Sequence, residues 1–216
     1  MDLLQPMVTG AAITVVLTIA SSAVAVLCAV VAGLARLSRS RPVRWLAVGY
    51  VEFFRGSSML VQLFWLYFVL PHLGMSLSPI TAGILGIGLN AGAYGAEMVR
   101  SAILAVPKGQ YEAAIALNMS PFTRFWRIIA PQALAIMLPA WGNNFINILK
   151  ATSLVSLITI HDLTYVGTTL NAMTYRTLEI FGAILIIYYV LGRWIIVPGM
   201  RYLERRATAG ILRAVR

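Results

Sequence analysis

The chain contains few acidic residues and few charged residues of any kind. Of its 216 residues, 7 are Asp or Glu and 17 are Lys or Arg, so the formal net charge is +10, although only 11% of the residues are charged. In an average soluble domain, about a quarter of the residues are charged. Together with 60% hydrophobic residues and a mean hydropathy of +0.83, this scarcity of charge predicts a polytopic membrane protein.

Other absences exclude several kinds of chemistry. The single cysteine, Cys28, rules out an internal disulfide and a cysteine-based zinc site. The two histidines, His72 and His161, have no metal-binding partner at ligand spacing. The sequence has no G-x-x-x-x-G-K-[ST] phosphate loop and no plausible Ser/His/Asp or Cys/His arrangement. We therefore expect no catalytic residues, no metal and no cofactor, and the chain itself cannot be an ATPase.

Apolar runs alternate with arginine clusters along the sequence. The runs predict an all-α integral membrane protein with about five spanning helices, at about residues 11–34, 58–70, 80–99, 134–158 and 178–198. Arginines gather in 36–44, in 100–127 and in a basic tail at about 199–216. Because cytoplasmic loops are enriched in Lys and Arg, we place these segments and the C-terminus in the cytoplasm and the N-terminus outside. The positive charge thus indicates topology rather than nucleic-acid binding.

Two further segments complete the predicted organisation. Residues 45–54 form an apolar stretch interrupted by charges, which predicts an interfacial helix leading into the second span. Residues 161–177 form a polar outer loop that we expect to be partly helical. The whole chain, residues 1–216, is interpreted as a single transmembrane domain.

The second arginine-rich segment is polar and punctuated by proline. Pro107 is suited to open a short helix, because the first helical position needs no N–H. Asn118 is suited to end it, since asparagine tolerates a positive φ better than other non-glycine residues. Ser120 and Pro121 predict the N-cap and first position of a second short helix, which Pro131 should end. We therefore expect a helix–turn–helix on the cytoplasmic side.

Within this segment, Glu112-Ala113-Ala114 is followed by Asn118 and Pro131. From the residues alone, Glu112 would only stabilise the first turn or so of its own helix through the helix dipole. The pattern resembles the EAA loop of ABC importer permeases, in which Asn118 replaces the usual glycine. The resemblance implies a type I importer permease with a coupling loop at about 100–131 that docks on a separate ATPase. It also implies that Glu112 meets basic groups of the ATPase while the alanines let the helix seat in a groove.

Other stretches narrow the resemblance. YVEFFRG followed by LVQLF before the second span, and KATSL in the fourth, are similar to the polar-amino-acid branch of these permeases. Where that branch usually has Gly-Thr-Pro, this chain has Gly56-Ser57-Ser58. These serines with the following aromatic run QLFWLYF resemble permeases for ectoine and hydroxyectoine, so the implied solute is a polar amino acid or such a compatible solute.

The resemblance also implies the setting and the partners. The chain would be a multi-pass protein of the bacterial inner membrane, in contact with membrane lipid and with no nucleic acid. It would assemble with two ABC ATPase subunits and a second permease chain, either identical or related. A periplasmic or lipid-anchored solute-binding protein would deliver the solute.

Polar side chains interrupt and follow the fourth span. Asn143, Asn147 and Lys150 share one helix face at i, i+4 and i+7, and a charge deep in a span usually faces protein or water. Two interpretations stay open: this stripe hydrogen-bonds neighbouring helices and backbone carbonyls, or it lines the substrate path together with Ser153. Asp162 is either a carboxylate at the outer mouth that meets a positive group of the substrate, or a helix cap or solvated loop acid.

The alternative function is a secondary transporter of small polar solutes that is driven by an ion gradient. It would need inverted repeats or broken helix pairs with a buried proton or Na⁺ relay. We find no repeat, and only Lys150 lies convincingly within a span. A membrane anchor without transport is a second alternative, and the asparagine stripe and the docking segment argue against it.

Overall fold

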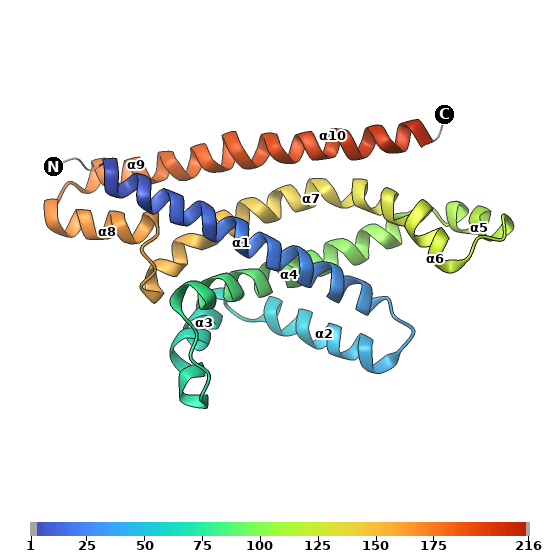
Figure 1. The fold of residues 1–216 in the computed structure, drawn as a ribbon, viewed down its shortest axis with the longest axis horizontal. Helices are drawn as coiled ribbons and strands as arrows, with labels where there is room; N and C mark the ends of the chain where they lie inside the picture. Colours follow the sequence, from blue (N-terminus) through green and yellow to red (C-terminus); the bar gives the residue numbers. More distant parts are fainter. Residues whose placement is uncertain (1–3, 215–216) are drawn as a thin grey trace.

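The computed structural model describes residues 4–214 as helices joined by short connections, with no strand among them (Figure 1). Helices α1 (Leu4–Arg36), α4 (Pro79–Ala105) and α7 (Ala130–Ala151) pack side by side, and α10 (Val197–Ala214) runs along α7. The predicted all-α fold is confirmed. The remaining α-helices are α2 (Arg41–Gly56), α3 (Met59–Phe64), α5 (Lys108–Ala116), α6 (Pro121–Arg124), α8 (Leu163–Thr174) and α9 (Thr177–Val190).

Small residues let α1 and α4 approach closely. The side chains of Ala25 and Ala29 on α1 are fully buried, and they face the glycines of α4. A Cβ atom on Gly92 would lie 2.7 Å from the Cβ atom of Cys28, and one on Gly95 would lie 2.7 Å from that of Ala29. Helices in a membrane associate through such close van der Waals packing, because lipid tails remove the hydrophobic driving force.

The spanning segments are longer and more broken than predicted. Within the described residues, two helices are long and apolar enough to cross a membrane, Leu4–Arg36 and Thr177–Ala207. Two bent pairs would raise this number to four: Arg41–Gly56 with Met59–Leu73, bent by 106°, and Pro121–Ile158 with Leu163–Thr174, bent by 52°. The predicted 80–99 span corresponds to α4, which has 27 residues. It is long enough to cross a membrane, but its many glycines lower its mean hydropathy, so it is not among these helices. The predicted interfacial helix and second span are the two arms of the 106° bend.

Amide side chains stabilise the bend between α2 and α3. The carbonyl oxygen of Phe54, near the end of α2, accepts hydrogen bonds from the side chains of Gln62 at 3.0 Å and Asn90 at 2.9 Å. Gln62 also donates to the hydroxyl of Ser57 at 2.7 Å. The carbonyls at a helix end lack intrahelical partners, so these two amides let the chain turn sharply within the protein.

Proline residues account for irregular turns in three helices. The π-helical segments η1 (Trp65–Val69), η3 (Phe125–Ile129) and η5 (Leu191–Ile196) are followed within two residues by Pro71, Pro131 and Pro198. Proline has no N–H and its ring clashes with the carbonyl four residues earlier, so the hydrogen-bond ladder must shift just before it.

The sequence analysis predicted that Pro131 ends the second short helix, and this prediction is wrong. The helix runs from α6 through η3 into α7 and then into the 3₁₀ segment η4 (Thr152–Ile158). A second 3₁₀ segment, η2 (Leu70–Leu73), ends the helix that begins with α3. Proline is tolerated in the first turn of a regular helix. Pro131 lies in the first turn of α7, directly after the π turn η3.

The two polar segments lie at opposite ends of the molecule. Helices α5 and α6 form one tip, whereas α8 and the N-terminal end of α1 lie at the other end (Figure 1). The outer loop predicted at 161–177 is largely helical, as α8. Of the predicted basic tail, residues up to 214 continue α10, and Arg216 lies outside the described residues.

We expect Gly92→Leu to lower the free energy of unfolding by about 1–3 kcal/mol, because the new side chain must push α1 away from α4. The midpoint of thermal unfolding in detergent micelles measures this loss. Gly182→Leu on α9 is the matched control, since nothing lies within 4 Å of a Cβ atom there. Equal losses in the two variants would mean that α1 and α4 do not pack as described.

Candidate docking helix and translocation path

The predicted helix–turn–helix is present and its turn is well defined. Asn118 adopts a φ of 53°, as expected for a residue that ends a helix in the left-handed conformation. Its N–H donates to the carbonyl of Ile115 at 2.8 Å, and the N–H of Met119 donates to that of Ala114 at 3.1 Å. These two bonds form a Schellman motif, which satisfies the last carbonyls of α5. The hydroxyl of Ser120 then accepts from the N–H of Thr123 at 3.3 Å and caps α6.

The residues of the Glu-Ala-Ala motif have different environments. Glu112 and Ala113 are exposed, whereas Ala114 is 2% exposed and faces the protein. The first turn of α5 contains no acidic residue, so Glu112 lies further along the helix than expected, where the helix dipole does less for it. Its carboxylate is therefore available to another protein. Pro131 lies away from these residues, in the first turn of α7.

Exposed apolar side chains accompany Glu112 in residues 108–124, which we call the docking tip because they contain the candidate docking helix. Leu117 is 75% exposed and Phe122 is 74% exposed, and Ile115 is also exposed. Exposed apolar clusters rimmed by polar groups mark interaction surfaces. The sequence analysis missed these residues. A sequence signal for them does exist: large apolar residues occur in an arginine-rich segment that is too short to form a core of its own.

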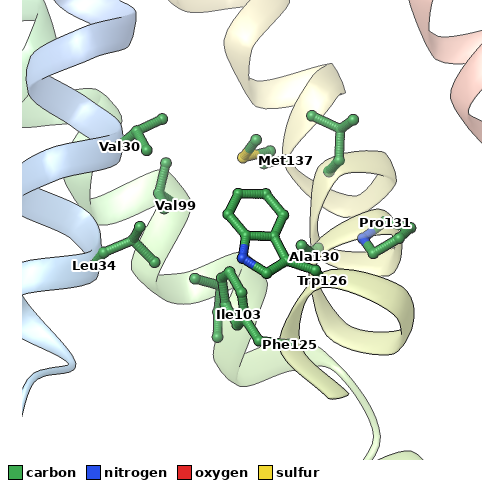
Figure 2. Close-up of a pocket in the computed structure, with 11 residues that line it drawn as sticks. Val30, Leu34, Val99, Ile103, Phe125, Trp126, Ala130, Pro131 and Met137 are labelled. Carbon is green, nitrogen blue, oxygen red and sulfur yellow. The ribbon is translucent and has the colours of Figure 1, made fainter. Parts of the chain in front are cut away.

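An apolar pocket of about 390 Å³ lies between α1, α4 and the η3–α7 segment that follows the docking tip. In Figure 2 the indole of Trp126 lies across this pocket, between Met137 of α7 and Ile103 of α4. Val30 and Leu34 of α1 form the far wall. The lining carries no charged side chain, so the pocket is unsuited to a polar solute.

The polar residues of α7 divide between two roles. Asn144 is buried, and its side chain donates to the backbone carbonyl of Ala91 on α4 at 3.2 Å. Asn143, Asn147 and Lys150 are exposed, and within the described residues their side chains have no hydrogen-bond partner. The hydrogen bond between helices is therefore made by Asn144, a neighbour of the predicted stripe. The stripe itself faces out of the single chain. Ser153 is half-buried, and its hydroxyl donates to the carbonyl of Lys150 at 2.8 Å.

A second pocket, of about 420 Å³, continues the stripe toward the docking tip. Ile136 and Ala140 line it from α7 and precede Asn143 on the same helix face, while Tyr94 and Ser101 line it from α4. The guanidinium of Arg55 lies 5.3 Å from the ring centroid of Tyr94. These polar groups were not among the predicted site residues, because their proximity depends on the packing of α2, α4 and α7.

Glu97, at the edge of this pocket, pairs with two arginines. Its carboxylate accepts from the Nε atom of Arg100, three residues further along α4, at 3.0 Å, and it also forms an ion pair with Arg36 of α1. Glu97 therefore joins the arginine-rich ends of α1 and α4.

Asp162 does not lie with the exposed residues of α7. Its side chain is fully buried and accepts hydrogen bonds from the N–H groups of Thr164 at 3.1 Å and Tyr165 at 3.0 Å, and from the hydroxyl of Tyr188 at 3.3 Å. This is the N-cap of α8. Of the two interpretations from the sequence, the geometry favours the helix cap, and we leave Asp162 out of the path proposed below.

Comparison with known proteins identifies the family. A family model described as the binding-protein-dependent transport system inner membrane component matches residues 22–209. The chain belongs to this family of ABC importer permeases. The permease is, as predicted, a multi-pass inner-membrane transport subunit rather than an enzyme.

Relatives cover nearly the whole permease. It is 44% identical over 194 residues to a probable amino-acid ABC transporter permease of Sinorhizobium fredii, covering 87% of this chain and 82% of that protein. It is 34% identical over 202 residues to the glutamine transport system permease of Escherichia coli, covering 93% and 92%. Its structure is similar to a crystal structure described as an amino acid ABC transporter with histidines. The TM-score is 0.86 and the sequence identity 35%, and the match covers 93% of this chain and 94% of that one.

We expect Asp162→Ala to lower the free energy of unfolding by about 1 kcal/mol, because the first N–H groups of α8 lose their cap. Asp162→Asn should retain most of that stability, since asparagine is an equally good N-cap. Thermal unfolding of the two variants provides the comparison. Full stability with abolished transport in Asp162→Asn would instead indicate a carboxylate that meets the substrate.

Proposed function

We propose that this permease forms half of a translocation path for polar amino acids and takes up the motion of a separate ATPase through α5. The exposed stripe on α7 is the observation that supports the translocation path. Polar and charged side chains within a span face protein or water, because exposure to lipid is costly. Asn143, Asn147 and Lys150 are exposed in the single chain, so something polar must cover them in the membrane.

A second permease chain, identical or related, is the partner that suits this face. Two copies set with α7 opposite α7 would enclose water between two such stripes. The path would run from Lys150, past Asn147 and Asn143, to the pocket beside Tyr94 and Ser101 near the docking tip. A binding protein outside the membrane would deliver the solute to the Lys150 end, with the arginine-rich ends of the helices in the cytoplasm.

The docking tip is the proposed contact with the ATPase. Glu112 would supply a carboxylate for a basic partner, while Leu117 and Phe122 would supply exposed apolar surface on the same tip. Interfaces commonly combine an apolar centre with a charged rim. The small side chain of Ala113 would let the exposed face of α5 approach the ATPase closely. Asn118 and Pro131 would set the orientation of α5 relative to α7.

Lys150 suggests the chemistry of the solute. Its ammonium group can pair with a carboxylate, which every amino acid carries, and the relatives described above are named as amino-acid and glutamine permeases. Ectoines also carry a carboxylate. However, Ser57, one of the residues that suggested them, is hydrogen-bonded in the bend between α2 and α3. We therefore propose polar amino acids, with ectoines as the competing solutes.

The substrate experiment is the ATPase activity of the importer reconstituted with its ATPase and binding protein. Glutamine, arginine, glutamate, ectoine and hydroxyectoine are titrated separately. Stimulation by one or more amino acids supports the proposal. Stimulation by ectoines alone would overturn the substrate class but keep the importer, and uptake driven by an ion gradient without ATP would overturn the importer itself.

We expect Glu112→Lys to lower ATP-coupled uptake by about tenfold or more, because a reversed charge in a paired interface costs about 2 kcal/mol or more. Uptake into proteoliposomes with ATP inside gives the measurement. Glu204→Lys, the same change on α10, is the matched control. Unchanged uptake and ATPase coupling in Glu112→Lys would remove α5 as the docking site, and a gradient-driven transporter would likewise be insensitive to this change.

We expect Lys150→Met to lower uptake per assembled complex by about tenfold or more, since a hydrogen bond to a charged group contributes about 1.5–3 kcal/mol. Lys150→Arg should retain most of the uptake. Uptake is normalised to complex recovered, and the unfolding midpoint is measured in parallel. A loss of stability with normal uptake per complex would mean that Lys150 holds the helix instead.

A further inference from the structure

The docking helix α5 has few contacts with the rest of the chain. Among its residues, Lys108–Ala116, only Ala114 is buried. The side chains of Gln110 and Gln132 meet at 3.5 Å, at the limit of a hydrogen bond. The turn after α5 is satisfied within itself by the bonds of Asn118 and Met119. Whatever force reaches α5 from a partner must pass through very few side chains.

One contact between α5 and the following helix stands out. The guanidinium of Arg124 lies 4.3 Å from the ring centroid of Tyr111, well inside the range of a cation–π interaction. The Nε atom of Arg124 is buried and has no hydrogen-bond partner. Within the described residues, Arg124 is in no ion pair. The face of Tyr111 is therefore its main partner.

The two residues occupy informative positions. Tyr111 precedes Glu112, the proposed contact with the ATPase, on α5. Arg124 is the last residue of α6 and continues without a break through η3 into α7, which carries the exposed stripe. The stack therefore joins the residue before the proposed docking residue to the helix that continues into the proposed path, and it bypasses the turn at Asn118.

We propose that Arg124 is a positioning residue that clamps α5 to α7 through Tyr111, so that the docking helix and the path helix move as one body. The proposal rests on the docking role proposed for Glu112. Loss of the clamp leaves the ATPase bound and active, but its motion is absorbed by the turn between α5 and α6. The specific signature is ATP hydrolysis without matching uptake.

The test uses the reconstituted importer with its ATPase and binding protein. Arg124→Ala, Tyr111→Leu and the double variant are compared with Tyr111→Phe, which keeps the aromatic face, and Arg127→Ala, which removes a neighbouring exposed arginine. The readouts are ATPase recovered with the permease, ATP hydrolysed, and amino acid taken up per ATP. Tyr111→Leu removes the aromatic face but keeps an apolar side chain at the position, so its comparison with Tyr111→Phe tests the stacking.

We expect Arg124→Ala and Tyr111→Leu each to lower uptake per ATP by about two- to tenfold, which corresponds to roughly 0.5–1.4 kcal/mol, the size of a cation–π contact. The double variant should be no worse than either single variant, because both remove the same contact. ATPase recovery should be normal in all of them, and Tyr111→Phe and Arg127→Ala should behave like the unmodified importer.

Three outcomes would overturn the clamp: additive losses in the double variant, equal losses in Tyr111→Phe and Tyr111→Leu, or normal coupling in Arg124→Ala. If Arg124→Ala fails to assemble, the comparison of Tyr111→Phe with Tyr111→Leu decides alone. Glu112→Lys, measured in the same preparation, separates the two proposals. Uncoupling by Glu112→Lys with normal Arg124→Ala refutes only the clamp, whereas normal coupling in Glu112→Lys refutes the docking role.

Discussion

The close packing of α1 against α4 is the constraint on which the rest of the permease depends. Because α4 presents glycines toward α1, it takes up little space on that side. It also holds α7, through the hydrogen bond from Asn144 to the carbonyl of Ala91 and through Trp141, whose ring packs beside Gly95, the glycine that also approaches Ala29 of α1. The central helix thus fixes both neighbours through backbone contact, with few long side chains that could adjust. The face of α7 that carries Asn143, Asn147 and Lys150 is set by this arrangement.

The cytoplasmic end is built differently from the bundle. Glu97 joins Arg36 of α1 to Arg100 of α4 in one cluster of charges, which ties these helix ends together. Beyond it, α5 has one buried residue, Ala114, and it meets the helices that follow through a few side chains, such as Tyr111 with Arg124 and Gln110 with Gln132. The bundle is thus firmly packed and the tip lightly attached, as the proposed transfer of motion through α5 requires.

Local signals in the sequence predicted most of what is local in the structure. The left-handed Asn118, the cap at Ser120 and the all-helical fold follow from the chemistry of single residues and from hydrophobic runs. Predictions from the sequence failed where the local structure depends on residues far away along the chain or on how a helix continues. Pro131 was expected to end a helix, but a π turn absorbs it. The bend at the end of α2 depends on Asn90, which is 36 residues away from Phe54 in sequence. The buried position of Asp162 depends on Tyr188, and no short-range pattern reveals that partner.

The π turn before Pro131 also sets the direction in which the docking tip faces. An α-helix advances by about 100° per residue, because about 3.6 residues complete a turn. A π turn accommodates one residue more than a regular turn does. Without the residue that this turn absorbs between 125 and 129, everything before it, including Glu112 and Phe122, would be rotated by about 100° about the axis of α7. The angular relation between the docking tip and the exposed stripe on α7 is thus set by a single surplus residue that a proline keeps in place.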